Sequence, residues 1–231
     1  MIVGIDGCRG GWYVVRQAAD GARIDSAVVP AFADVLASLP TDALVAIDIP
    51  IGLAEQGERA CDQLARTLLK PHRASSIFSA PLRAVLGATS HEDASNRRFA
   101  RDGKRMSIQA YNILAKISEV DAALRDAAMR DRVHEVHPEL SFAAMNAGTP
   151  LQQSKKSAEG RRVRLELLRR HFGDQPARLL DETKRNDATA DDVLDALAVL
   201  WSAMRIAQGS SRSLPEEPPR DSTGLRMAIY F

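Results

Sequence analysis

The chain has 231 residues, of which 45% are hydrophobic and 26% charged, and its 31 Lys and Arg almost balance its 30 Asp and Glu. This composition predicts one globular domain with a sizeable core, and the net charge alone favours neither a nucleic-acid nor a membrane partner. Cys8 and Cys61 match no zinc or redox motif, and no apolar run is long enough to span a bilayer. We therefore expect a soluble, cytoplasmic protein with reduced thiols and no membrane partner.

Residues 1–15, MIVGIDGCRGGWYVV, predict two strands joined by a tight turn that contains glycine. Asp6 comes at the end of the first, apolar strand. A carboxylate in that position loses hydration and needs a metal ion or a set of hydrogen-bond donors in compensation. Two interpretations of Asp6 stay open: a metal ligand, or a turn residue whose carboxylate accepts from backbone amides.

The next elements extend the predicted sheet. Residues 23–29 alternate enough to form a third strand, which would complete an antiparallel meander, and residues 31–39 predict a short helix. Residues 43–49, ALVAIDI, form an apolar run typical of a central strand that is covered on both faces. Asp48 is the single acid of this run and, like Asp6, comes near its C-terminal end.

A mostly helical segment follows, which we expect to act as core and scaffold. Residues 58–69, 90–102 and 107–128 predict helices, while residues 71–81, PHRASSIFSAP, have no clear period and predict an ordered loop.

The second half continues with a short strand over residues 132–136, helices from Pro138 and over 161–172 and 189–207, an irregular tail, and a last strand over 225–231. Alternation puts Glu135 and His137 on one sheet face at the end of the short strand. Glu139 follows in the first turn of the next helix, and a histidine with two carboxylates suits metal binding or proton transfer. The alternative is that His137 is a structural residue with satisfied hydrogen bonds.

The last long helix carries the sequence DDVLDALAVL, in which Asp192 and Asp195 are three residues apart and share one helical face. Capping of the helix explains Asp192 equally well, whereas Asp195 comes a turn further in. If the strands of Asp6, Asp48 and Glu135 are parallel neighbours, their acids line one rim of the sheet. This helix would complete an acidic pocket, for which Mg²⁺ or Mn²⁺ is the expected ion.

Six segments of the chain together resemble a known family: GIDGCRGGW, AIDIPIGL, RASSIFSAPLR, SIQAYNILAKISEVD, EVHPELSF and DDVLDALA. They are similar to an uncharacterised bacterial family of predicted nucleases with a ribonuclease H-like fold. Within that superfamily the motifs are closest to the RuvC-type resolvases. The resemblance implies an α/β fold whose mixed central sheet has three antiparallel strands, then parallel strands, flanked by helices. It also implies a single domain over residues 1–231 with a helical insertion around residues 54–130.

Carried over by position, Asp6 resembles the first-strand metal ligand, Asp48 the fourth-strand acid, and Asp192 with Asp195 the pair on the last helix. The resolvase branch carries Glu where this chain has Asp48. We therefore expect a two-metal nuclease that hydrolyses phosphodiester bonds, with Glu135 and His137 as further catalytic candidates.

Nucleic acid is the expected partner, and Arg73, Ser75 and Ser76 are candidates for contacts with its phosphate oxygens. Lys155 and Lys156 offer similar contacts, although a solvated face explains these lysines as well. Two other functions stay open: an inactive binding or scaffold protein of the same fold, and an ATP-dependent phosphotransferase of actin-like fold. The sequence also leaves open a homo-oligomer.

Overall fold

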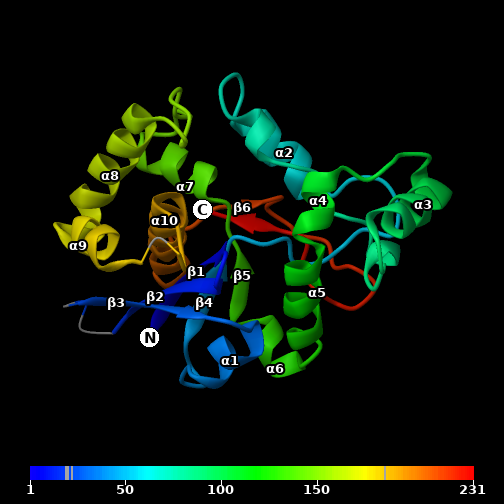
Figure 1. Cartoon of the computed structure of the whole chain (residues 1–231), viewed down its shortest axis with the longest axis horizontal. Helices are drawn as coiled ribbons and strands as arrows, with labels where there is room; N and C mark the ends of the chain where they lie inside the picture. Colours follow the sequence, from blue (N-terminus) through cyan, green and yellow to red (C-terminus); the bar gives the residue numbers. More distant parts are fainter. Residues whose placement is uncertain (19–20, 22, 185) are drawn as a thin grey trace.

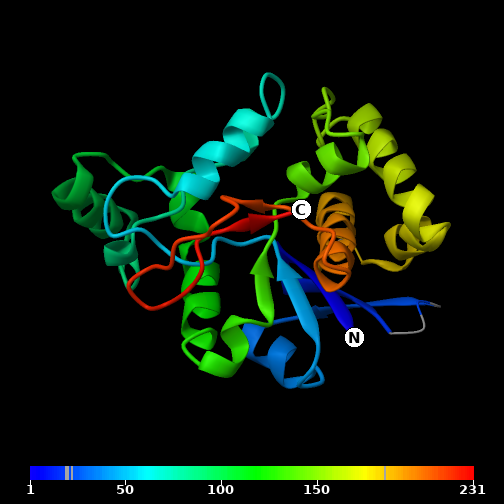
Figure 2. The same ribbon diagram turned by 180° about the vertical axis from the view of Figure 1, so that it is seen from behind.

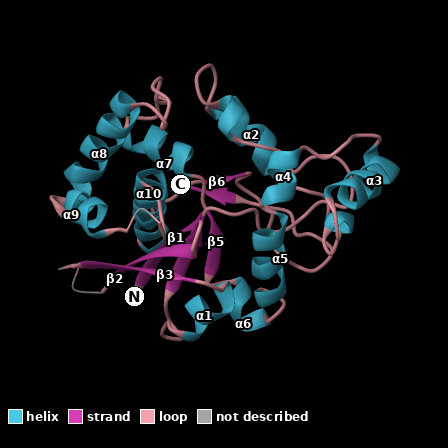
Figure 3. Ribbon diagram, viewed as in Figure 1, coloured by secondary structure: helices cyan, strands magenta, loops and turns pink. Residues whose placement is uncertain are grey.

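Five strands form the central sheet of the computed structural model, in the order β3-β2-β1-β4-β5 (Figures 1 and 3). The strands are β1 (Ile2–Cys8), β2 (Gly11–Gln17), β3 (Ile24–Val29), β4 (Leu44–Ile47) and β5 (Val133–Glu135). The first three pair antiparallel, whereas β4 is parallel to β1 and β5 is parallel to β4. The predicted meander followed by parallel strands is therefore confirmed. The structure describes residues 1–18, 21, 23–184 and 186–231.

Helices cover both faces of this sheet, as the two opposite views in Figures 1 and 2 show. On one face, α1 (Phe32–Ala37) and α5 (Leu114–Ala123) pack against the side chains of Val3 and Ile5. The other face carries α7 (Pro138–Met145), α8 (Ala158–Phe172), α9 (Gln175–Glu182) and α10 (Ala190–Ala207), which pack against Tyr13 and Val15. Both faces of the central strands are thus buried, as their apolar sequences predict.

Gly4 allows α10 to lie directly on β1. A Cβ atom at Gly4 would stand 2.4 Å from the backbone nitrogen of Leu200 and 2.5 Å from the carbonyl oxygen of Ala196. Because a glycine has no Cβ, the strand and the helix approach this closely without a clash. Side chains alternate along a strand, so Asp6, two residues after Gly4, points to the same face as α10.

The chain between β4 and β5 forms a largely helical region beside the sheet (Figure 1). Besides α5 it contains α2 (Ala60–Leu68), η1 (Ala74–Ser76), η2 (Arg83–Val85), α3 (His91–Asp102), α4 (Ile108–Asn112) and α6 (Ala127–Arg130). The helix predicted over residues 107–128 is therefore divided. One reason is Asp126, whose side chain accepts from the amide of Ala128 and so starts α6 as a new helix.

The C-terminal segment forms a small second sheet of β6 (Ser213–Leu214) and β7 (Ile229–Tyr230). The predicted last strand is thus much shorter than residues 225–231. The helix α9 was not predicted, although Pro176 in its first turn is a typical helix-start signal. None of the described helices combines the length and the apolar character needed to cross a membrane.

Candidate functional site

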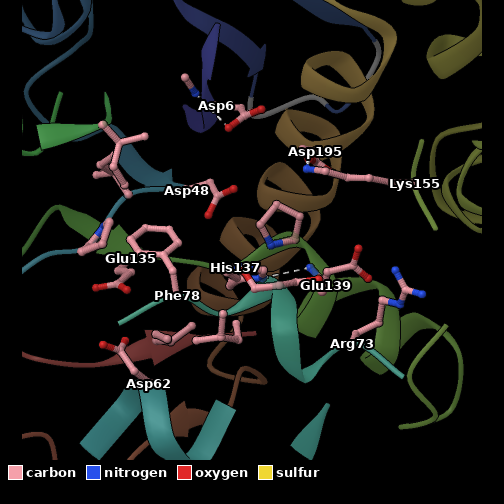
Figure 4. Close-up of a pocket in the computed structure, with 18 of the residues that line it drawn as sticks. Asp6, Asp48, Asp62, Arg73, Phe78, Glu135, His137, Glu139, Lys155 and Asp195 are labelled. Atoms are coloured by element: carbon pink, nitrogen blue, oxygen red, sulfur yellow. Dashed lines mark hydrogen bonds and ion pairs between the residues drawn. The ribbon is translucent and has the colours of Figure 1, made fainter. Parts of the chain in front are cut away.

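Three carboxylates from distant parts of the chain line one pocket of about 610 Å³ (Figure 4). Asp6 comes from β1, Asp48 directly follows β4, and Asp195 comes from α10. Asp6 and Asp195 are 8% and 3% exposed, so both lie recessed within the pocket. The structure therefore brings together three of the four acids that the sequence predicts as metal ligands.

Strand register and the glycine contact explain this convergence. Gly4 pairs with Ala46 in the parallel β1–β4 ladder, so Asp6 and Asp48, each two residues further on, are neighbours on the same sheet face. That face is the one on which α10 lies, with Ala196 against Gly4. The third acid of the pocket directly precedes Ala196 on the helix.

The three acids disfavour one another's ionised forms. Burial, with added repulsion from Asp48 and Asp195, raises the pKa of Asp6 well above its ordinary value. Burial also raises the pKa of Asp48 to about 7 and that of Asp195 to about 6, even though Lys155 opposes both shifts. Full ionisation of this group near neutral pH therefore requires more positive charge than one lysine supplies.

Lys155 already supplies one positive charge to the acids. Its Nζ atom donates to Oδ2 of Asp195 at 2.6 Å, and its side chain is 42% exposed while that of Asp195 is 4% exposed. Attraction to Asp195, Asp48 and Asp6 raises the pKa of Lys155, so the lysine stays charged. The interpretation of Lys155 as part of a solvated face is therefore wrong.

Glu135 does not join the acidic group. The parallel ladder pairs Glu135 with Ile47, whose side chain packs on the opposite sheet face from α10. There Arg59, 3% exposed, donates to both carboxylate oxygens of Glu135 at 2.8 Å, and the amide of Ile51 donates at 2.7 Å. Both oxygens are thus engaged in a buried structural ion pair. The expectation that Glu135 acts as an outer ligand or a proton carrier is not supported by these contacts.

His137 has hydrogen-bond partners on both ring nitrogens. Its Nδ1 accepts from the amide of Glu139 at 3.2 Å, which caps α7, so in the neutral ring Nε2 carries the proton and donates to the carbonyl oxygen of Ser76 at 3.3 Å. Burial lowers the pKa of His137, which also favours the neutral ring. His137 lines the pocket, and these contacts fit its structural interpretation.

Asp192 caps α10 instead of lining the pocket. Its Oδ2 accepts from the amide of Thr189 at 2.7 Å, while the Thr189 hydroxyl accepts from the amide of Asp192 at 3.3 Å. This reciprocal arrangement is a capping box. The capping interpretation of Asp192 therefore fits the geometry, and Asp195 alone represents the last helix in the pocket.

Basic and hydroxyl side chains form another part of the pocket wall. Arg73, Ser75 and Ser76 all line it, as the sequence proposed, and the Nη2 atom of Arg73 donates to the carbonyl oxygen of Gln152 at 2.7 Å. Lys116 of α5 is an addition that no local pattern indicated. Its Nζ atom lies 4.4 Å from the centre of the Trp12 ring and donates to the carbonyl oxygen of Gly11.

Glu139, which the sequence groups with Glu135 and His137, also lines the pocket. It is 5% exposed, and its Oε1 atom accepts from Arg164 at 2.6 Å. Its Oε2 atom is buried and has no hydrogen-bond partner within the described chain. A buried carboxylate oxygen in this state favours a ligand that donates to it or coordinates it.

The donors of the pocket fit a hard divalent cation, since Asp6, Asp48 and Asp195 supply only carboxylate oxygens. As the side chains stand, with Lys155 against Asp195, no group of three or more His, Cys, Asp or Glu in the described residues is spaced to hold an ion. Binding of a cation would therefore require Lys155 to leave Asp195 and the carboxylates to draw closer.

The fold and the pocket define a mixed α/β protein with recessed acids at the C-terminal ends of parallel strands, a usual place for ligands in such sheets. The chain belongs to the family described as "Protein of unknown function (DUF429)", whose match covers residues 4–220. No curated protein and no solved structure matched the chain.

Proposed function

We propose that this protein is a metal-dependent nuclease of the ribonuclease H-like class, which hydrolyses phosphodiester bonds of a nucleic acid. In this proposal the whole chain is one domain, and residues 54–130 are a helical insertion between β4 and β5. The observation that carries the proposal is the convergence of Asp6, Asp48 and Asp195 in one recessed pocket with too little positive charge to balance them.

In this proposal the acidic and the basic side chains of the pocket have different tasks. Asp6, Asp48 and Asp195 hold the cation through their carboxylate oxygens. A bound Mg²⁺ or Mn²⁺ would supply Lewis-acid activation of water and stabilisation of the leaving oxygen. Arg73 and Lys155 line the same pocket and bind the phosphate oxygens of the strand, which orients the phosphodiester against the acids.

The test is the substitution Asp6→Asn, assayed for Mn²⁺-dependent cleavage of single-stranded, duplex, hybrid and branched substrates. We expect loss of cleavage with an intact fold, since the amide keeps the size of the side chain and removes one anionic ligand. Asp192→Asn is the matched control: its amide oxygen can still accept from the amide of Thr189 in the capping box, so we expect an intact fold and unchanged cleavage. Unchanged cleavage by the Asp6 variant would reject the proposal.

One contact favours a second candidate, a binding protein of the same fold without nuclease activity. The ion pair between Lys155 and Asp195 partly neutralises the acids without any metal. Such a protein would bind the same nucleic acids and leave them intact in Mn²⁺. The substrate panel above separates the two functions, because only the nuclease loses an activity on Asp6→Asn.

A further inference from the structure

The wall of the pocket carries an aromatic ring that the core does not use. Phe78 is 39% exposed, and it is absent from the hydrophobic clusters that the described residues form. Of the large hydrophobic side chains with comparable exposure in the described chain, Phe78 alone lines this pocket. Exposing a phenyl ring to water forgoes the free energy of its burial, so its position favours a ligand that covers it.

The backbone on both sides of Phe78 is held in place. Ile77 and Ala80 are buried, at 5% and 6% exposure. The carbonyl oxygen of Ile77 accepts from Arg66 at 3.1 Å, and the amide of Ala80 donates to Asp62 at 3.1 Å, both on α2. The ring is therefore presented by a loop that is anchored before and after it, which lowers the entropy lost when a ligand binds.

Phe78 and the basic side chains Arg73 and Lys155 occupy different sides of the pocket. Figure 4 shows Phe78 with Asp48 on one side, and Arg73 with Lys155 on the other. A nucleotide has the same division, because its base offers a flat apolar face and its phosphate offers negative charge. The pocket volume of about 610 Å³ lies in the range typical of sites for single small ligands.

The recess of the acids limits how a nucleic acid can reach them. Asp6 and Asp195 are almost fully buried, whereas a duplex keeps its bases stacked inside and presents its phosphates on a convex outer surface. An unpaired strand bends freely, and its bases are available for stacking on aromatic side chains. We propose that the pocket binds one unpaired nucleotide, with its base stacked on Phe78 and its phosphate directed to the acids and basic side chains. This inference rests on the proposed function and names its substrate class, a single-stranded region of nucleic acid.

The test measures binding of labelled oligonucleotides with Ca²⁺ as the divalent cation, and compares wild type with Phe78→Ala and Phe78→Tyr. The probes are oligo(dT), oligo(U), a duplex of matched length, and an oligomer of abasic deoxyribose phosphates that keeps the phosphates and lacks bases. We expect wild type to bind the single strands more tightly than the duplex and the abasic oligomer. The affinities for oligo(dT) and oligo(U) then show whether DNA or RNA is the better ligand. Phe78→Ala should weaken binding of the preferred strand by about 5- to 150-fold and leave abasic binding unchanged, because stacking contributes about 1–3 kcal/mol per base.

Phe78→Tyr should keep most of the affinity, since it retains an aromatic face. Phe99→Ala is the matched control, because Phe99 is 50% exposed on α3 and does not line the pocket. Equal binding of the preferred strand by wild type and Phe78→Ala, equal binding of duplex, or no binding of either strand would overturn the inference. Cleavage that persists with unchanged binding in Phe78→Ala would overturn it and leave the nuclease proposal standing. Stacking-dependent binding without any cleavage would support the inference and reject the nuclease proposal.

Discussion

Replacing Asp48 by Asn should stabilise the metal-free protein while it abolishes metal-dependent activity. Burial raises the pKa of Asp48 to about 7, so the folded state holds its ionised carboxylate less favourably than the unfolded chain does. An amide of the same size has no charge to desolvate. The residue would thus be kept for its ligand chemistry at the expense of stability, a trade-off common at functional sites.

The size and sign of the effect follow from the same pKa. A rise from 3.8 to about 7 corresponds to about 4 kcal/mol at most. Because Asp48 shares repulsion with neighbouring acids, we expect a gain of about 1–3 kcal/mol above pH 7. Well below pH 3.8 the carboxyl is protonated in both the folded and the unfolded state, so the variant and wild type should have the same stability. The gain should therefore appear as pH rises from about 4 to about 7 and then level off.

Urea unfolding in EDTA at several pH values, followed by tryptophan fluorescence, measures this gain. Asp42→Asn is the control, since Asp42 is an exposed acid in the turn before β4 and its replacement should have no comparable effect. Free Mn²⁺ at 100 times the Kd should cancel or reverse this difference, because metal binding adds about 2.7 kcal/mol to the stability of wild type alone. An Asp48→Asn protein that is less stable than wild type, or whose difference does not change with pH, would refute the reasoning.

Two further substitutions test how the acids are balanced and positioned. Lys155→Met should tighten Mn²⁺ binding about tenfold in calorimetry, because the ion no longer has to displace a lysine from a buried carboxylate. Lys156→Met is the control and should have a smaller effect, since Lys156 is an exposed lysine of the same pocket. Weaker binding by Lys155→Met would contradict this competition. Gly4→Ala should cost at least about 1–3 kcal/mol in urea unfolding, because its Cβ would overlap the backbone of α10. At Gly7 the added Cβ would meet only the flexible Lys116 side chain, at 3.1 Å, so Gly7→Ala should cost less, and equal losses would argue against the close strand–helix contact.

The sheet and three acids of the pocket were predictable because their signals are local. Apolar runs of strand length mark β1 and β4, and each run has one acid near its C-terminal end. Parallel strands bring such ends to one edge of the sheet, so Asp6 and Asp48 were expected at the same edge if their strands are parallel neighbours. Asp195 was also predictable as a pocket acid, since capping explains an acid in a first helical turn but not one a turn later.

The register between strands was not visible, and it decides which acids meet. A shift of one residue turns every side chain of a strand to the other face. The β4–β5 ladder pairs Glu135 with Ile47 and leaves Asp48 on the opposite face, a relation that neither strand encodes by itself. The capping box of Asp192 was within reach, because Thr189 stands three residues earlier.

The residues contributed by loops had no periodic signal at all. Phe78 and Lys155 belong to segments without regular structure. Lys155 and its partner on α10 are 40 positions apart in the sequence, and nothing in the sequence indicates their contact. Aromatic residues make up only 5% of the chain, yet one ring in the right place suffices for one base. Composition describes the whole chain, whereas binding depends on which few side chains reach a pocket.

The same pocket contains two kinds of buried carboxylate, and their counterions distinguish their roles. Glu135 shares Arg59 with Asp62, and this arginine donates to both side chains, so the charges are held in place by hydrogen bonds. Such a network fixes the loop around Ile51 and has no need of a ligand. Asp6 and Asp48, in contrast, take part in no ion pair among the described residues, and burial raises the pKa of both. A fold that ties one set of acids to a buried arginine and leaves Asp6 and Asp48 without an ion-pair partner among the described residues is arranged to receive positive charge there from outside.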